Sequence, residues 1–249
     1  MREQIDTIPV NEAIRAEGEC PFCHLERQAE QRAMRYALGP GASYMEPDVR
    51  AATDARGFCR AHYKKMFDYG NSLGSALMMQ THFVGLLKEL EYQADNCTAP
   101  GKRGFLSKKP LEETELLAWA KEKNSTCYLC EKLEYNMNRY YITFFHMIKD
   151  EEFRKLVESG KGFCMHHFAQ VLEASAKYLP NAQIQWFYET VCRLMKENLA
   201  RVQGDLDWFI AKFDYRNAGA DWKNSKDAVS RSMQKLRGGY VTDPPYKQD

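Results

Sequence analysis

The sequence predicts an all-α fold built from two related helical halves. Three observations lead to this prediction. Apolar residues recur at steps of three and four along most of the chain, no segment sustains the polar–apolar alternation of a strand, and one cysteine–histidine pattern occurs twice. The two copies begin at Cys20 and Cys127, 107 residues apart. This period is too long for a solenoid repeat and fits a duplicated half-domain.

The first half is expected to span residues 1–95. Pro21 suits the first turn of a helix, Gly39-Pro40-Gly41 ends that helix, and Gly57 permits a sharp turn. The helices expected here are a short amphipathic turn at 10–14, then 23–38, 47–55, 60–69 and 72–94.

The second half is expected at 111–236, after a linker at 96–110 that is rich in proline, glycine and basic residues. Its helices are expected at 111–123, 131–148, 149–159, 167–178, 182–216 and 222–236. The fifth is the longest, with one apolar stripe that runs from Ile184 to Phe213. Residues 237–249 contain paired glycines and prolines and are expected to form a flexible tail.

The repeated pattern is Cys-x2-Cys, a long spacer, then Gly-Phe-Cys-x2-His. Three thiolates and one imidazole form a common tetrahedral zinc set, and residues three apart can aim both side chains at one ion. We therefore predict two structural zinc ions, one for each copy of the pattern. The ligands of the first ion are Cys20, Cys23, Cys59 and His62, and those of the second are Cys127, Cys130, Cys164 and His167.

Other cofactors fit parts of this pattern. A Cys3His set can hold an iron–sulfur cluster, which is the main alternative to zinc. Cys20 to His24 matches a c-type haem attachment sequence, but Glu131 replaces this histidine in the second copy. A thioredoxin-type redox motif would need a nearby βαβ unit, which the helical pattern does not provide.

The remaining histidines and cysteines have ordinary interpretations. Alignment of the copies pairs His62 with His167, which leaves His166 as a neighbour of the ligand set. His24 is expected on an exposed helix face. His82 and His146 lie on apolar helices, where a hydrogen-bonded structural histidine is more common than a catalytic one. Cys97 and Cys192 fall outside the pattern and are expected to be free thiols.

Composition limits the functional classes. The 35 Lys and Arg residues balance 34 Asp and Glu residues, which argues against an extended nucleic-acid contact. No apolar signal sequence or bilayer-spanning stretch is present, so we expect a cytoplasmic protein that does not enter a membrane. In that compartment cysteines serve as metal ligands or thiols more often than as disulfides.

The two motifs CPFC…GFCRAH and CYLC…GFCMHH, together with the C-terminal KFDYRN signature at 212–217, resemble a family of bacterial proteins of unknown function. The resemblance extends from Cys20 to about Leu236 and implies an intact family member, but it brings no activity. Asp214 and Arg216 in the signature are interpreted as a structural ion pair, with a functional patch as the alternative.

The function predicted from these observations is that of a binding or regulatory module with two closed zinc sites and a protein partner. A closed four-ligand site leaves no position for a substrate, and no familiar catalytic motif is present. The alternative is an iron–sulfur redox protein, or an enzyme whose pocket between the halves is lined by His82, His146 and tyrosines. The sequence does not predict an oligomeric state.

Overall fold

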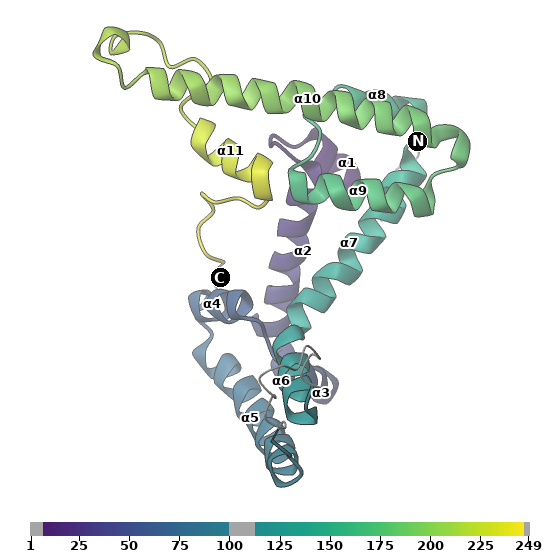
Figure 1. Ribbon diagram of the computed structural model, residues 1–249, viewed down its shortest axis with the longest axis vertical. Coiled ribbons are helices and arrows are strands. Elements are labelled where there is room, and N and C mark those ends of the chain that lie inside the picture. Colours follow the sequence, from purple (N-terminus) through teal and green to yellow (C-terminus); the bar gives the residue numbers. More distant parts are fainter. Residues whose placement is uncertain (1–6, 100–112, 247–249) are drawn as a thin grey trace, which may run out of the picture. The chain divides into compact units, whose positions relative to one another are not determined.

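The computed structural model describes residues 7–99 and 113–246, and these residues form helices and connecting turns with no strand among them (Figure 1). The all-α prediction is confirmed. The elements are α1 (Ile8–Arg15), α2 (Pro21–Leu38), η1 (Ser43–Met45), α3 (Pro47–Arg56), α4 (Arg60–Tyr69), α5 (Ser72–Asp95), α6 (Glu115–Ser125), α7 (Tyr128–Met147), α8 (Glu151–Glu158), α9 (Met165–Tyr178), α10 (Asn181–Ala211), η2 (Tyr215–Asn217) and α11 (Ala228–Arg237).

The chain forms two compact units that do not coincide with the expected halves at 1–95 and 111–236. Unit 1 consists of Met1–Ala29 and Tyr135–Pro244, and unit 2 of Glu30–Glu134 and Pro245–Asp249. The boundaries fall inside α2 and α7, so each of these helices contributes residues to both units. Most of the linker expected at 96–110 lies outside the described residues.

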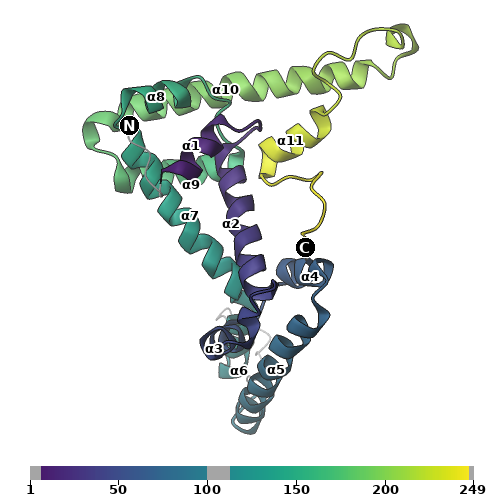
Figure 2. The same cartoon turned by 180° about the vertical axis from the view of Figure 1, so that it is seen from behind.

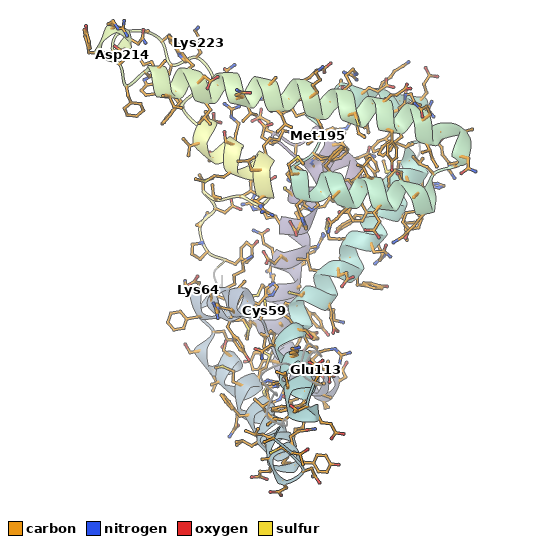
Figure 3. The ribbon with its side chains drawn as sticks, in the orientation of Figure 1. Cys59, Lys64, Glu113, Met195, Asp214 and Lys223 are labelled. Carbon is orange, nitrogen blue, oxygen red and sulfur yellow. The ribbon has the colours of Figure 1, made fainter. Side chains whose placement is uncertain are left out.

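Unit 1 is organised along α10, with α8, α9 and α11 packed beside it (Figures 1 and 2). The apolar stripe predicted on α10 is buried in its central part, whereas Ile210 near the C-terminal end is 62% exposed. Its buried positions are Phe187, Val191, Leu194, Met195 and Val202, and Met195 is labelled in Figure 3. The centre of this unit is aromatic because rings from α2, α7 and α10 meet there. The rings that are fully buried belong to Phe22, Phe144, Phe145, Phe163 and Phe187.

The C-terminal end of α10 differs from the prediction. The helix ends at Ala211 rather than 216, and Phe213 is 75% exposed. The buried Lys212 ammonium donates to the carbonyl oxygens of Asn217, Ala218 and Ala220, which closes the chain into a turn. The last helix likewise begins at 228 rather than 222, because the ring of Trp222 packs in this turn against Phe209.

A buried ionic cluster holds the N-terminal segment of unit 1 immediately before Cys20. The carboxylate of Glu19 is fully buried and lies 2.5 Å from the Arg201 guanidinium and 3.5 Å from the Lys235 ammonium. Lys235, itself 1% exposed, also donates to the carbonyl oxygens of Glu19 and Lys161. Buried charges require this degree of pairing, so the cluster fixes where the chain enters α2.

Unit 2 packs α3 against α5, with α4, α6 and η1 around them. Its core joins residues from both ends of the unit's sequence, including Met34, Phe58, Met78 and Leu129.

Part of the predicted flexible tail has defined contacts: in unit 1 Asp243 pairs with Arg27 at 2.5 Å. Among the described residues, no helix is both long enough and apolar enough to cross a bilayer.

Candidate metal centres

The eight predicted ligands lie in two four-residue clusters, but the clusters do not follow the two copies of the sequence pattern. Cluster A contains Cys20, Cys23, Cys164 and His167, and lies in unit 1. Cluster B contains Cys59, His62, Cys127 and Cys130, and lies in unit 2.

The clusters contain the same eight residues that the sequence indicated as ligands, but the predicted grouping of four residues from each copy was wrong. Each cluster takes the Cys-x2-Cys of one copy and the Cys-x2-His of the other. Each compact unit nevertheless holds one complete set of three cysteines and one histidine.

Cluster A is closed and buried. The Nδ1 atom of His167 lies 3.5 Å from the sulfurs of Cys20 and Cys23 and 3.2 Å from that of Cys164. The sulfurs of Cys23 and Cys164 are 3.7 Å apart. All four residues are at most 2% exposed.

Cluster B has the same arrangement but is more open. The Nδ1 atom of His62 lies 3.3 Å from the sulfur of Cys59, 3.2 Å from that of Cys127 and 3.4 Å from that of Cys130. The Cys59 and Cys130 sulfurs are 3.8 Å apart. Cys130 is exposed and Cys59 partly exposed, whereas Cys127 and His62 are buried. Figure 3 labels Cys59 at the start of α4.

These distances match a single tetrahedral ion. Bonds of about 2.3 Å to sulfur and 2.0–2.1 Å to nitrogen place two sulfurs roughly 3.8 Å apart, and a sulfur and a nitrogen roughly 3.6 Å apart. The sulfur–sulfur distances are 3.7 and 3.8 Å, and the sulfur–nitrogen distances lie between 3.2 and 3.5 Å. The donor atoms in each cluster all lie within 4.8 Å of one another. The residues present therefore fit one metal ion in each cluster.

Helix N-termini position every ligand. Cys23 and Cys130 lie in the first turns of α2 and α7, while Cys59 and Cys164 are the N-cap residues of α4 and α9. The Cys164 sulfur accepts a hydrogen bond from the backbone N–H of His167. The positive end of a helix dipole stabilises a thiolate, so these places favour the metal-binding form of cysteine.

Glycine turns bring the Cys-x2-His segments to the clusters. Gly57 and Gly162 have φ angles of +58° and +71°, in a region that residues other than glycine rarely adopt. In unit 2 the backbone N–H of Tyr128 donates to the Gly57 carbonyl at 3.0 Å, which joins the two segments of cluster B directly. Pro21 occupies the corresponding place in cluster A and has no N–H to donate.

The proton balance of the clusters favours cation binding. Burial raises the pKa of Cys127, but hydrogen bonds with His62 and with the backbone of Cys130 and Cys59, together with the charge of His62, lower the pKa to about 6. Burial lowers the pKa of His62 and of His167, but the neighbouring cysteines, and for His62 also Glu30, raise each pKa to about 10. Each cluster thus holds protons on nitrogen or sulfur that a metal ion would displace.

Both histidines have a carboxylate on the side away from the sulfurs. The Nε2 atom of His62 lies 3.2 Å from Glu30, and that of His167 lies 3.7 Å from Glu26. Glu30 also accepts from Lys65 and Tyr246. Burial raises the pKa of Glu30, but its hydrogen bonds with His62, Lys65 and Tyr246 together lower the pKa to about 2. A carboxylate on the second ring nitrogen fixes the orientation of a metal-binding histidine.

Sequence analysis missed both carboxylates. Glu26 and Glu30 are four residues apart in α2, beyond the Cys-x2-Cys motif, and they serve different histidines. The second copy offers no equivalent spacing that would have identified them.

The other residues considered from sequence lie outside the two clusters. His166 is exposed, with its ring 5.1 Å from that of His167, and Cys97 and Cys192 are exposed thiols. In unit 2 the Nδ1 atom of His82 is 2.7 Å from the Asp54 carbonyl oxygen, and in unit 1 His146 is exposed on the last turn of α7.

Asp214 and Arg216 form a local structural pair. The Asp214 carboxylate accepts from the backbone N–H of Arg216 at 2.9 Å and from its guanidinium at 2.6 Å. This pair closes the turn beyond α10, where Figure 3 labels Asp214 and Lys223. The structural interpretation of the signature residues agrees with these contacts.

Comparison with known protein families matches residues 1–243 to DUF6062, a family of unknown function. The chain belongs to the DUF6062 family. The searches of curated proteins and of solved structures found no match. The two clusters and the surface around them are therefore the features of this family member that bear on its function.

Proposed function

We propose that the protein is a cytoplasmic binding or regulatory module whose two helical units are each held together by one structural zinc ion. The observation that carries this proposal is the closed geometry of the clusters. Three sulfurs and one imidazole nitrogen surround each centre at tetrahedral spacing, and cluster A is wholly buried. Four protein ligands complete the coordination of structural zinc and leave no position for a substrate.

The spacing of the donor atoms favours a single ion over an iron–sulfur cluster. In such a cluster the protein ligands are shared among two or more iron atoms, so ligands on different irons lie further apart than ligands of one ion. All donors in each cluster lie within 4.8 Å of one another. Zinc is preferred among single ions because tetrahedral thiolate–imidazole sites are typical of it.

Each ion would connect elements that are distant in sequence. In cluster A it would tie the start of α2 to the start of α9, and in cluster B the start of α4 to the start of α7. Binding of structural zinc contributes about 10–16 kcal/mol in finger peptides, which is comparable to the whole stability of a domain. We infer that the ions stabilise a helical scaffold whose outer surfaces recognise a protein partner.

Elemental analysis and an absorbance spectrum of protein purified without oxygen test this proposal. We expect about two zinc ions per chain and no visible absorbance. Iron with acid-labile sulfide would replace the proposal by the redox alternative. Protein that contains neither metal but has eight free thiols would overturn the zinc proposal.

A further inference from the structure

The outward face of α5 in unit 2 is apolar along most of its length. Helix positions that point away from α3 and α4 define a solvent stripe with steps of three and four. Its members are Leu73, Ala76, Leu77, Gln80, Phe83, Val84, Leu87 and Leu90. Five of the large side chains are exposed: Leu73 by 67%, Phe83 by 58%, Val84 by 51%, Leu87 by 55% and Leu90 by 42%. This stripe is the reverse of the usual pattern, in which polar residues face water.

The solvent stripe carries no charge. No Asp, Glu, Lys or Arg occurs from Ser72 to Leu87. Nucleic acid and anionic membrane surfaces attract basic side chains, which this face does not offer. The segment 100–112, which lies outside the described residues, contains four basic residues. The stripe has no carboxylate with which these residues could form ion pairs. An uncharged apolar helix face is instead the complement of another such face.

The arrangement of the stripe is symmetric about its one polar member. Leu73 and Leu87 each lie seven residues from Gln80, in opposite directions, and Leu77 and Phe83 each lie three residues from it. In an antiparallel pair of α5 helices, Leu73 of one copy therefore faces Leu87 of the other. The two Gln80 amides meet near the two-fold axis, where each can donate to and accept from the other. A wholly apolar partner would leave this amide unsatisfied.

We propose that the solvent stripe of α5 is a homodimer interface in which two copies of the chain pair antiparallel about Gln80. The exposed parts of these five side chains present on the order of a few hundred Å² of apolar surface on each copy. Specific interfaces bury about 800 Å² on each side, and weak ones less. The pairing is therefore expected to be weak and to depend on protein concentration.

Sedimentation equilibrium of the full chain from roughly 1 to 200 µM tests the pairing. The mass is expected to rise from 28.9 kDa towards twice this value with increasing concentration. Leu87→Glu should weaken the dimer by at least about 100-fold, since each interface would contain two buried carboxylates. Tyr92→Glu is the matched control, because Tyr92 is 67% exposed on the same helix but lies off the stripe.

A mixture of Leu87→Glu and Leu73→Lys tests the antiparallel geometry. Each variant alone should be monomeric, whereas the mixture should regain dimers, because the carboxylate introduced at position 87 of one chain then faces the ammonium introduced at position 73 of the other. An unmodified chain that stays monomeric, a dimer that survives Leu87→Glu, or a mixture that stays monomeric would each overturn the proposal.

The proposed dimer does not depend on the proposed zinc ions. All eight ligands remain in every variant, so the metal content measured alongside should equal that of the unmodified chain. Protection of the stripe from solvent in a monomer would assign it to a segment of the same chain and would also overturn the homodimer.

Discussion

The exchange of ligands between the two copies of the sequence pattern can be tested by counting metal in two double variants. Cys23→Ser with Cys164→Ser alters cluster A alone, because these sulfurs lie 3.7 Å apart at one centre. Cys23→Ser with Cys59→Ser alters one ligand in each cluster. The first variant should keep about one ion per chain, and the second should lose both or bind both weakly.

The free energy of unfolding of the double variants should follow the same pattern as their metal content. Loss of one sulfur already removes most of what the ion contributes, so a second change in the same cluster adds much less than the first. A change in the other cluster removes a second ion, and each ion is worth several kcal/mol on the scale of finger peptides. Changes in one cluster are therefore strongly non-additive, while changes in different clusters add.

Zinc content after desalting and unfolding by denaturant provide the two measurements. Ligation within each copy of the pattern makes the opposite prediction for both variants. Retention of about one ion by Cys23→Ser with Cys59→Ser, and of none by Cys23→Ser with Cys164→Ser, would refute the arrangement described above.

Three further predictions follow from the same structure. A chelator or thiol reagent should attack cluster B before cluster A, because Cys130 is exposed while the cysteines of cluster A are buried; equal rates of zinc release would contradict this. Glu30→Gln should weaken metal binding at cluster B by about 10–100-fold. Glu26→Gln should have a smaller effect at cluster A, because the Glu26 carboxylate lies 3.7 Å from His167, whereas that of Glu30 lies 3.2 Å from His62. Competition with a chromophoric chelator measures both affinities. Gly57→Ala should lower the unfolding free energy by about 1–3 kcal/mol, since its φ is +58° and its new methyl group would lie 2.9 Å from the His82 ring. The control Gly204→Ala, on an open helix face, should raise the unfolding free energy by up to about 1 kcal/mol. Thermal melts measure both variants.

Most helices could be predicted because their signals are local. The boundaries of α4 match the prediction, and those of α3 and α5 differ by one residue. The end of α10 could not be predicted from periodicity, because the apolar pattern continues to Phe213 while the backbone turns around the Lys212 ammonium. A side chain that bonds carbonyls five to eight residues ahead leaves no periodic signal.

The residues of the two clusters could be picked out from the sequence, but their grouping could not. A spacing of three residues fixes which two side chains can share an ion, and it leaves open which Cys-x2-Cys meets which Cys-x2-His. That choice is made by long-range packing, such as the stacking of Phe22 on Tyr141 at 4.5 Å and its contact with Phe163 in unit 1. The carboxylate of Glu30 was missed for a related reason, since it becomes a partner of His62 only through packing of α2 against α4.

The grouping of residues from both copies also sets the order in which the two clusters can form during chain synthesis. Cys59 and Cys130 are 71 residues apart in sequence, and this loop is nested inside the 141-residue separation of Cys23 and Cys164. During translation, cluster B can close once Cys130 has emerged, while Cys20 and Cys23 must wait for His167. Until Cys127 is made, the only complete set of ligands is the four residues of the first copy. An ion bound by those four residues at that stage would have to leave Cys59 and His62, or Cys20 and Cys23, before the two clusters of the folded chain could form.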